Sequence, residues 1–325
     1  MIERACPGCG GTEHRPHWRK EDVRLVQCVA CGMVFANPVP AALATGEHYE
    51  GLADGLYLSP DKLAADYAAV RFERELKLFR EFCGGPLTPA HSPSDGERES
   101  RAPSASRRVL DVGCSTGGFL FQLEARWPDV YERLGTDVVG PALDHAERQG
   151  VPVLRANFLE HDFGAKQFDA VTLWAVVEHL VDPSKFLAKA AKVLRPGGHC
   201  FVLVPNLQSL ALRLLGPRYR YVMAEHVNYF TAATLRRFVA TVPGLEVVAL
   251  RSTHLNPVVL WQDWRSGGRQ VPDAERVALL KRTTTWKQRG AFGLVRRSYA
   301  AVERTLGLFK MADNLVVVTR RAGGL

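Results

Sequence analysis

The stretch Val109–Phe119, which reads VLDVGCSTGGF, constrains the fold of this chain more than any other feature. Its first four residues are apolar apart from Asp111, which is typical of a buried strand. Gly113 and Gly117 then break the strand, and the apolar residues that follow favour a helix. Glycine is expected where the backbone turns sharply and lets a ligand come close. A strand, a glycine-rich turn and a helix together form the front of a nucleotide-binding α/β unit.

A second strand with an acidic end follows about twenty residues further on, which is the spacing typical of nucleotide-binding units. It reads Leu134-Gly-Thr-Asp137. A carboxylate at this point accepts hydrogen bonds from ribose hydroxyl groups. We therefore expect Asp137 to contact the ribose of a nucleoside-containing cofactor.

The glycine-rich turn carries a resemblance to a known family. Asp111-Val-Gly113-Cys-Ser115-Thr-Gly117 resembles motif I of the class I S-adenosylmethionine-dependent methyltransferases, D/E-x-G-x-G-x-G, with Ser115 in place of the middle glycine. The dehydrogenase fingerprint G-x-G-x-x-G spaces its glycines differently and has no acid two residues before the first. The resemblance continues, in family order, through four further segments. They are the fourth strand Phe168–Trp174, the segment Val177–Leu180 after it, the turn Leu194–Gly198 and the fifth strand Cys200–Pro205. The resemblance implies a Rossmann-like α/β sheet of seven strands whose last strand is antiparallel.

The resemblance also implies a cofactor site for S-adenosyl-L-methionine. Asp111 is expected to hold the methionine end indirectly, and Asp137 to accept both ribose hydroxyl groups. Asn157 is expected near the adenine, with Asp162 as the competing residue. The residues expected to bind the cofactor are Asp111, Gly113, Ser115, Gly117, Asp137, Asn157 and Trp174.

Two cysteine pairs near the N-terminus predict a metal site. Cys6-Pro-Gly-Cys9-Gly and Cys28-Val-Ala-Cys31-Gly are separated by eighteen residues, a spacing that suits four thiolates around one tetrahedral Zn²⁺. Disulfides and redox pairs are the alternatives, and both are less favoured in a cytosolic chain. Four cysteine ligands leave no open coordination position, so we interpret the zinc as structural.

The chain is expected to divide into four parts. A leading helix over Asp61–Phe82 keeps a helical period and would cover the substrate pocket or pack on the sheet edge. The segment after it is rich in Pro, Ser, Gly and Arg, which is typical of a mobile linker. The expected parts are a zinc ribbon (1–40), a connecting and pocket-covering helical segment (41–83), a flexible linker (84–108) and a methyltransferase domain (109–325) with a basic helical insertion at about 254–312.

The positive charge is concentrated near the C-terminus. From Arg251 onward the chain carries 14 Lys/Arg and 5 Asp/Glu, or +9, against +8 for all 325 residues. The insertion that contains Trp261, Trp264 and Trp286 is therefore either a solvated helical surface or a site for an anionic partner. There is no apolar run near eighteen residues and no signal peptide, so we expect a cytoplasmic protein with no membrane span.

Two Glu-His pairs are the candidates for proton transfer. Glu178-His179 follows the fourth strand, and Glu225-His226 belongs to a segment that ends in Tyr-Phe. Strands of this kind bind ligands at their carboxyl ends, and a histidine is suited to general base catalysis near neutral pH. The second pair resembles the Glu-His-x-x-Tyr-Phe segment of sugar C-methyltransferases, which also carry an N-terminal zinc site. Their Tyr two residues before the Glu is Met223 here.

We therefore expect His226, His179 and Glu225 to be catalytic, with His226 slightly favoured as the base. For the pair Glu178-His179, a role in shaping the pocket is the alternative.

The leading function is methyl transfer to a small-molecule acceptor, such as a sugar, a glycan precursor or a secondary metabolite, and a phosphate-bearing acceptor would suit the basic insertion. An RNA methyltransferase with a zinc module is the first alternative, although the N-P-P-Y motif is absent from Leu173-Trp-Ala-Val. A non-catalytic scaffold is the second. The acceptor atom, C, O or N, is left open.

The zinc hypothesis makes a direct prediction. The purified chain should contain about one Zn²⁺ per molecule by elemental analysis, and Cys28→Ser should lose it because a closed tetrahedral site needs all four thiolates. Cys83→Ala is the control, since this single cysteine is expected only to pack. A full-length protein that carries no metal after purification without chelators would contradict the hypothesis.

Overall fold

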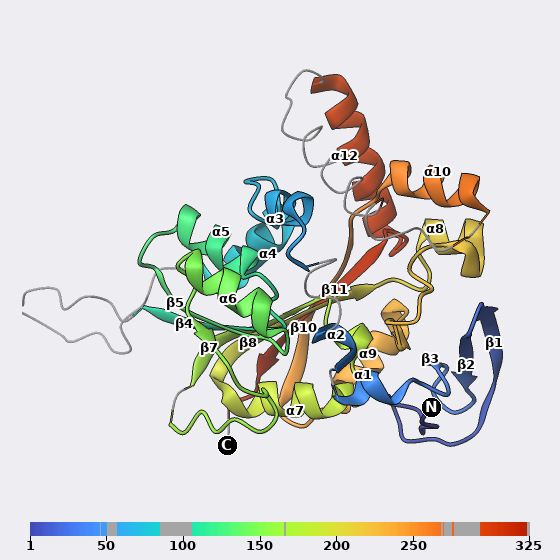
Figure 1. The fold of residues 1–325 in the computed structure, drawn as a ribbon, viewed down its shortest axis with the longest axis horizontal. Coiled ribbons are helices and arrows are strands. Elements are labelled where there is room, and N and C mark those ends of the chain that lie inside the picture. The colour runs from blue at the N-terminus through green and yellow to red at the C-terminus, as the bar shows by residue number, and fades with distance from the viewer. Residues whose placement is uncertain are drawn as a thin grey trace, which may run out of the picture.

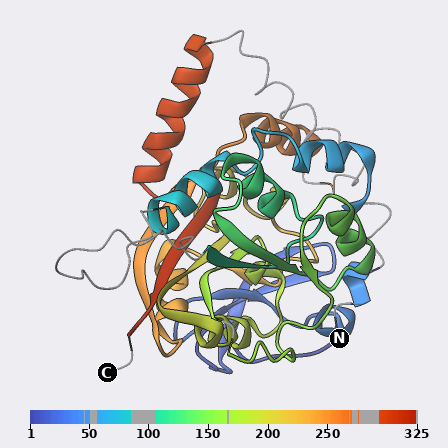
Figure 2. The same cartoon turned by 90° about the vertical axis from the view of Figure 1, so that its left-hand side faces the viewer.

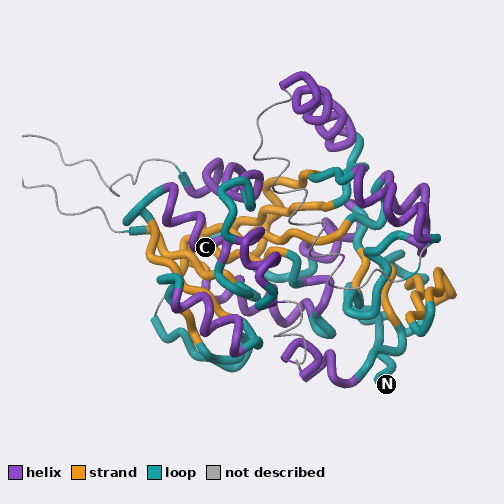
Figure 3. Tube along the Cα trace, turned by 45° about the horizontal axis from the view of Figure 1, so that its top comes forward, coloured by secondary structure: helices purple, strands orange, loops and turns teal. Residues whose placement is uncertain are grey.

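The computed structural model describes residues 1–45, 47–50, 57–84, 106–165, 167–267, 269, 275 and 293–323. Two sheets organise these residues. A large sheet runs through the middle of the molecule, with helices on both of its faces, and a small sheet lies near the N-terminus (Figures 1 and 3). Most of the predicted linker and Trp286 lie outside the described residues.

The large sheet confirms the predicted doubly wound topology. Its seven strands run in the order β10-β11-β8-β7-β4-β5-β6, and β11 is antiparallel to both of its neighbours. The pairs between β8 and β6 are parallel. The strands are β4 (Arg107–Val112), β5 (Tyr131–Thr136), β6 (Val153–Leu154), β7 (Phe168–Trp174), β8 (Leu194–Pro205), β10 (Leu245–Thr253) and β11 (Asn314–Arg321).

Alternating side chains on these strands build an apolar core on each face of the sheet. On β7, Ala170 belongs to one buried cluster and Val171 to the other, because successive residues of a strand point to opposite faces. One face is covered by α4 (Glu73–Cys83), α5 (Gly118–Arg126) and α6 (Gly140–Arg148), and the other by α7 (Pro183–Val193) and α9 (Ala232–Ala240). Figure 2 shows the sheet between these two layers.

One sequence prediction of local structure is wrong. The expected helix over Asp61–Phe82 is two helices, α3 (Pro60–Asp66) and α4, and Phe72, the residue before α4, has a left-handed backbone with φ 58° that no right-handed helix contains. The predicted turn over Leu194–Gly198 is an irregularity inside strand β8: Leu194 pairs with Phe168 and His199 with Ala170, residues 195–198 are skipped in this pairing, and Gly197 takes φ 79°.

The N-terminal module shares a sheet with the rest of the chain. Strands β1 (His14–Lys20), β2 (Val23–Cys28) and β3 (Val34–Ala36) form an antiparallel meander, and β9 (Asn228–Tyr229) pairs with β3 as its fourth strand. Met33 and Phe35 are buried in the same apolar cluster as α7 and α9. The module is therefore continuous with the core of the catalytic domain.

The remaining described helices frame the carboxyl edge of the sheet. The chain leaves β8 and β10 at this edge and returns to it before β11, because Asn314 pairs with Pro205 and with Thr253. Helix α12 stands away from the body in both views (Figures 1 and 2). Within the described part of the chain, no helix is long and apolar enough to cross a bilayer. These elements are α1 (Ala41–Thr45), α2 (Glu47–Glu50), α8 (Leu210–Leu215), α10 (Pro257–Ser266) and α12 (Gly293–Leu308), with 3₁₀ turns at Val177–His179 and Gly216–Arg218.

Candidate functional site

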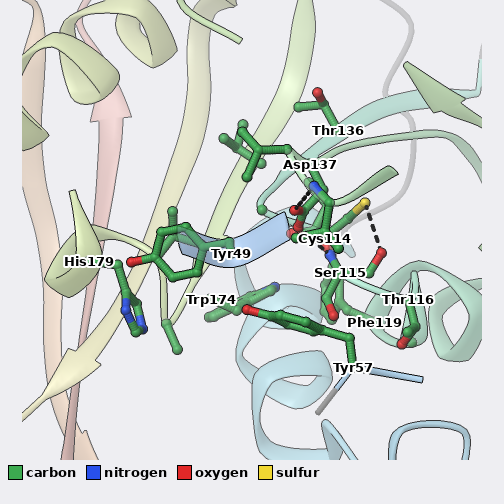
Figure 4. Close-up of a pocket in the computed structure, with 18 of the residues that line it drawn as sticks. Tyr49, Tyr57, Cys114, Ser115, Thr116, Phe119, Thr136, Asp137, Trp174 and His179 are labelled. Carbon is green, nitrogen blue, oxygen red and sulfur yellow. Dashed lines mark hydrogen bonds between the residues drawn. The ribbon is translucent and has the colours of Figure 1, made fainter. Parts of the chain in front are cut away.

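A cavity of about 310 Å³ lies where strands β4, β5 and β7 end. In Figure 4 the motif I turn lies on one side of it, and Tyr49 and His179 lie on another. The carboxyl edge of a parallel sheet is where α/β proteins bind ligands. Of the predicted cofactor residues, six contribute to its wall, namely Asp111, Gly113, Ser115, Asp137, Asn157 and Trp174.

The turn after β4 is shaped by close backbone packing. A Cβ on Gly113 would lie 2.5 Å from Cγ2 of Val176, and the residue has φ 72°, so only glycine fits. Ser115 also takes a left-handed backbone, with φ 52°, where the family pattern has glycine. Gly117 does not line the cavity: a Cβ there would lie 3.0 Å from Ala146, so this glycine lets helices α5 and α6 pack.

Asp111 is held inside the protein below the turn. Its side chain is 3% exposed, and it accepts a hydrogen bond of 2.5 Å from the hydroxyl of Thr172 on the neighbouring strand. Burial raises its pKa to about 7, the Thr172 hydrogen bond partly offsets this, and the nearby Asp137 adds to the rise. The predicted indirect role of Asp111 at the methionine end therefore stays a prediction.

Asp137 is tied to the motif I turn. Its carboxylate accepts hydrogen bonds from the backbone N–H of Ser115 (2.7 Å) and of Val139 (3.0 Å). Burial nevertheless raises its pKa. These two bonds leave acceptor positions on the carboxylate, which faces the cavity. The geometry suits the predicted contact with ribose hydroxyl groups.

Of the two residues considered for the adenine contact, one lines the cavity and the other does not. Asn157 lines the cavity, but its amide donates to Glu160 Oε1 (3.1 Å) and accepts from the N–H of Leu159 (2.9 Å). Its competitor Asp162 lies outside the cavity wall and accepts a bond from the N–H of Gly164. The contact between Asn157 and the adenine therefore stays a prediction. To make it, the amide would have to break or share its bonds with Glu160 and Leu159.

One wall of the cavity comes from residues that the sequence analysis did not assign. Lys62, Asp66 and Arg71 line it beside Thr116, and Asp66 forms ion pairs with the other two while accepting a bond from Thr116 Oγ1 (3.3 Å). Charges of both signs next to the motif I turn suit the amino and carboxylate groups of a methionine tail. The only signal in the sequence was the expectation that this helical segment covers the pocket.

Several buried polar atoms in the cavity wall have no hydrogen-bond partner within the described residues. Within the described residues, Ser115 Oγ, Trp174 Nε1 and Tyr49 Oη are buried and make no hydrogen bond. Buried polar groups are normally paired, so each such atom calls for a ligand or an ordered water. Unpaired polar atoms beside a turn in which Gly113 has no room for a Cβ are consistent with the binding of an adenosyl cofactor.

The two predicted histidines lie against each other. Their rings are 4.7 Å apart between centroids, nearly perpendicular, and His179 also meets the ring of Tyr49 at 5.8 Å. Nδ1 of His179 is 3.0 Å from the carbonyl oxygen of Glu225, and Nδ1 of His226 is 2.9 Å from that of Tyr221. A carbonyl can only accept, so Nδ1 of each ring is the donor, and in a neutral ring the lone pair would then lie on Nε2.

The pair is unequal in its access to the cavity. His179 is part of the wall, whereas His226 is 7% exposed and packs behind it. Glu225 lies outside the wall as well, with its carboxylate 3.7 Å from Nε2 of His48. The structure thus brings the three predicted catalytic residues together, and only one of them lines the cavity.

Glu178 is a further acidic group beside the histidines. It is 1% exposed, its Oε2 has no partner within the described residues, and its Oε1 is 3.9 Å from Nε2 of His179. Burial raises its pKa to about 8. Ligand atoms of Glu178, His179 and His226 all lie within 4.8 Å of one another, so this set could share a proton or hold a cation.

The four N-terminal cysteines form a compact cluster. Their sulfur atoms lie within 4.8 Å of one another, with Cys6 Sγ 3.5 Å from Cys31 Sγ and Cys9 Sγ 3.6 Å from Cys28 Sγ. Such separations fit the edges of a tetrahedron around Zn²⁺, because each Zn–S bond is about 2.3 Å long. The glycine after each second cysteine, Gly10 or Gly32, takes φ 74° and donates its N–H back to the first cysteine of the pair.

The comparisons with known proteins agree with this geometry. A family model described as a methyltransferase domain matches residues 86–250, about half of the chain. The chain belongs to this family: it is a class I S-adenosylmethionine-dependent methyltransferase.

Individual relatives add detail. A ubiquinone biosynthesis O-methyltransferase of Ralstonia nicotianae is 30% identical over 174 residues, 49% of this chain and 71% of that protein. Its counterpart from Caulobacter vibrioides is 35% identical over 134 residues, 38% of this chain, and the match spans only about half (52%) of that protein. The crystal structure of the [4+2]-cyclase SpnF superimposes with a TM-score of 0.50 over 88% of this chain and 99% of that chain, at 16% identity, which supports the fold alone.

The raised pKa of Asp111 predicts a pH-dependent stability. The unfolded carboxyl, with a pKa near 3.8, releases its proton at lower pH than the folded one, at about 7, so the free energy of unfolding falls as pH rises between these values. Asp111→Asn removes this titration and keeps an acceptor for Thr172. Between pH 5 and pH 7.5, urea denaturation should show the variant losing about 2 kcal/mol less stability than the wild type.

The control for this experiment is Glu246→Gln, whose side chain is 56% exposed and should follow the wild type. Parallel pH profiles for Asp111→Asn and the wild type would show that Asp111 does not titrate as described.

The contact expected between Asp137 and the ribose can be measured by calorimetry. Asp137→Ala should weaken binding of S-adenosylhomocysteine by about 1.5–3 kcal/mol, because hydrogen bonds to a charged group are lost. Asp162→Ala is the matched control and should bind normally, since Asp162 lies outside the cavity wall. Unchanged affinity in Asp137→Ala would remove this residue from the site.

Proposed function

We propose that this enzyme methylates a hydroxyl group of a small-molecule acceptor, in the range of a sugar, a glycan precursor or a secondary metabolite. The observation that carries the proposal is the position of His179, which lines the same cavity as the motif I turn and is backed by His226 and Glu178. The curated relatives are named as O-methyltransferases of a small molecule, which favours oxygen as the acceptor atom.

The residues present fit an adenosyl cofactor. Asp137 would hold the ribose, the turn from Gly113 to Thr116 would face the methionine end, and Asp66 and Arg71 would pair with its charged groups. The bound cofactor supplies a methyl group made electrophilic by a sulfonium. The chain's own contribution is then to bring the acceptor in line with that methyl group and to take a proton from the acceptor.

His179 is the residue that we assign as the base. Its Nδ1 lies 3.0 Å from the carbonyl oxygen of Glu225, which fixes the ring, and in a neutral ring of this tautomer Nε2 would be the atom that takes up a proton. The imidazolium that forms would lie 3.9 Å from Glu178, and its positive charge would favour ionisation of that carboxyl, whose pKa burial raises to about 8. His226 packs on the ring of His179 and keeps it in place, so we move the role of base from His226 to His179.

Aromatic side chains close the cavity around the acceptor. Tyr49 and Tyr57 form part of its wall together with Phe119 and Trp174. Trp174 packs against Phe119 with 5.3 Å between ring centroids. Apolar walls exclude water from the reacting groups, and the hydroxyl of Tyr49 is available to orient a hydroxylated acceptor.

We assign a structural role to the Cys6, Cys9, Cys28 and Cys31 cluster. All four cysteines are ligands in a Zn²⁺ site of this type, so no position is left for a substrate. Zinc bound there would stabilise the module that carries β3, and β3 pairs with β9 next to His226. Methyl transfer itself involves none of these sulfur atoms.

The acceptor can be identified by isotope transfer. The protein is incubated with trideuteromethyl S-adenosylmethionine and, in parallel, with a small-molecule extract or with total RNA, and both are analysed by mass spectrometry. We expect an O-linked trideuteromethyl group on a compound of the small-molecule fraction. Label found only in RNA, for which the basic C-terminal region would be the binding surface, would overturn the proposal.

The role of His179 makes a quantitative prediction. With the identified acceptor, His179→Gln should lower kcat about 10²-fold or more, because the general base is lost, and should leave the affinity for S-adenosylhomocysteine nearly unchanged. His226→Gln should reduce turnover less, since that ring only supports His179. His161→Gln is the control, because its ring packs on Phe163 away from the cavity. Near-normal turnover in His179→Gln would mean that proximity alone accounts for the reaction.

A further inference from the structure

The side chain of Arg4 joins the N-terminal module to two separate segments of the catalytic domain. Its guanidinium donates to the carbonyl oxygens of Ala36 (3.2 Å), Val181 (3.0 Å) and Val227, and to Asn228 Oδ1 (3.0 Å). Within the module, its backbone N–H donates to the side chain of Asn37 (3.0 Å). One guanidinium therefore connects β3, the segment after the 3₁₀ turn Val177–His179 and the segment that leads into β9.

The same two catalytic segments are also bonded to each other. The N–H of Val227 donates to the carbonyl oxygen of Glu178 (2.8 Å). The side-chain amide of Asn228 donates to the carbonyl oxygens of Val177 (2.8 Å) and Leu180 (2.7 Å). The 3₁₀ turn that carries His179 and the strand that follows His226 are thus fixed to one another, with Arg4 bonded to both.

The metal-binding end of the module lies close to these bonds. Arg4 is two residues from Cys6, and its guanidinium lies 5.4 Å from the ring of the fully buried Phe35. Phe35 pairs with Asn228 across the β3–β9 ladder and shares an apolar cluster with Cys6 and Cys28. A change in the fold of the cysteine cluster therefore reaches the histidine pair through contacts between neighbouring residues.

The chemistry of Arg4 suits a coupling role. Its oxygen partners include three backbone carbonyls from three segments, so the bonds fix where the segments lie. A planar guanidinium with five N–H groups can satisfy such partners at once, whereas an ammonium ion cannot hold the same fork geometry. Displacing the guanidinium would remove the donor to the carbonyl oxygen of Val181, whereas the carbonyl oxygen of Val227 would keep the N–H of Ala36.

We propose that the N-terminal module fixes the shape of the acceptor site. Arg4 is the positioning residue that couples the fold of the cysteine cluster to the placement of His179 and His226. The inference rests on the proposed function only for what the two histidines do. The coupling itself is a property of the folded chain and is measured without any acceptor.

Hydrogen exchange of the zinc-loaded, full-length protein tests the coupling. In Arg4→Gln, peptides that cover residues 175–182 and 225–230 should exchange at least tenfold faster than in the wild type. The carbonyl oxygens of Val181 and Val227 lose the guanidinium that holds the two segments together, so the bond from the Val227 N–H to the Glu178 carbonyl should open more often. Zinc content and affinity for S-adenosylhomocysteine should stay unchanged. Arg4→Lys, which keeps the charge and loses the fork, should show the same pattern to a smaller degree.

Two matched controls separate coupling from general destabilisation. Arg15→Gln alters the same module, but there Arg15 bonds only to Gln27 within the β1–β2 hairpin. Arg74→Gln breaks a distant ion pair with Glu303. Neither variant should accelerate exchange at residues 175–182. Removal of the metal from the wild type with a chelator should reproduce the pattern of Arg4→Gln.

A spectroscopic readout reports on the histidines directly. In protein with ¹³C-labelled histidine rings, the signals of His179 and His226, assigned with single variants, should shift in Arg4→Gln while those of His161 and His199 stay in place. Faster exchange confined to residues 1–40, or histidine signals identical to the wild type, would overturn the inference. If the coupling is found but His179→Gln keeps full turnover, the proposed base is wrong and the coupling of the module stands.

Discussion

The close approach of the backbone at Gly113 to the side chain of Val176 is the constraint on which the rest of the site depends. Any Cβ on Gly113 would collide with Val176 at 2.5 Å, so the end of β4 and the segment after β7 can lie this close only with glycine there. The motif I turn and the turn that carries Glu178 and His179 consequently share one cavity. This contact brings the expected cofactor turn and the proposed base into the wall of one cavity.

Burial sets the electrostatics on both sides of that contact. Asp111 below the motif I turn and Glu178 below the histidine are both nearly inaccessible to water, and burial raises the pKa of each carboxyl, to about 7 and about 8. Such groups cost stability when they ionise, which is typical of functional sites. Their shared feature is that each supports a group in the cavity wall from behind.

The N-terminal module contacts the segments that carry the two histidines. Its strand β3 takes up β9 from the catalytic domain, and its Arg4 bonds to the segments on either side of the histidine pair. The module that carries the cysteine cluster is thus bonded to the segments that follow His179 and His226.

Much of the fold followed from the sequence because strands and glycine turns are local signals. The stretch from Val109 to Phe119 and the strand at Phe168–Trp174 were located correctly from hydrophobicity and glycine spacing. The break between α3 and α4 was missed because the left-handed backbone of Phe72 is imposed by tertiary packing rather than by residue type.

The candidate site was predicted only in part, for the same physical reason. Asp111 and Asp137 belong to a contiguous motif, whereas Asp66, Arg71 and Tyr49 come from segments before the motif that carry no recognisable pattern. The sequence identified both histidines as candidates and slightly favoured His226, whereas His179 is the one that lines the cavity. That ranking depends on which ring faces the cavity, and the facing ring is decided by packing between residues 47 positions apart.

The central claim is that one cavity holds the cofactor with its reactive end toward His179. A crystal structure of the full-length protein with S-adenosylhomocysteine measures this directly. The account predicts the ribose on the carboxylate of Asp137, the homocysteine tail beside Asp66 and Arg71, and the sulfur on the side of the cavity lined by Tyr49 and His179. A ligand bound elsewhere, or one whose sulfur faces away from His179, would contradict it.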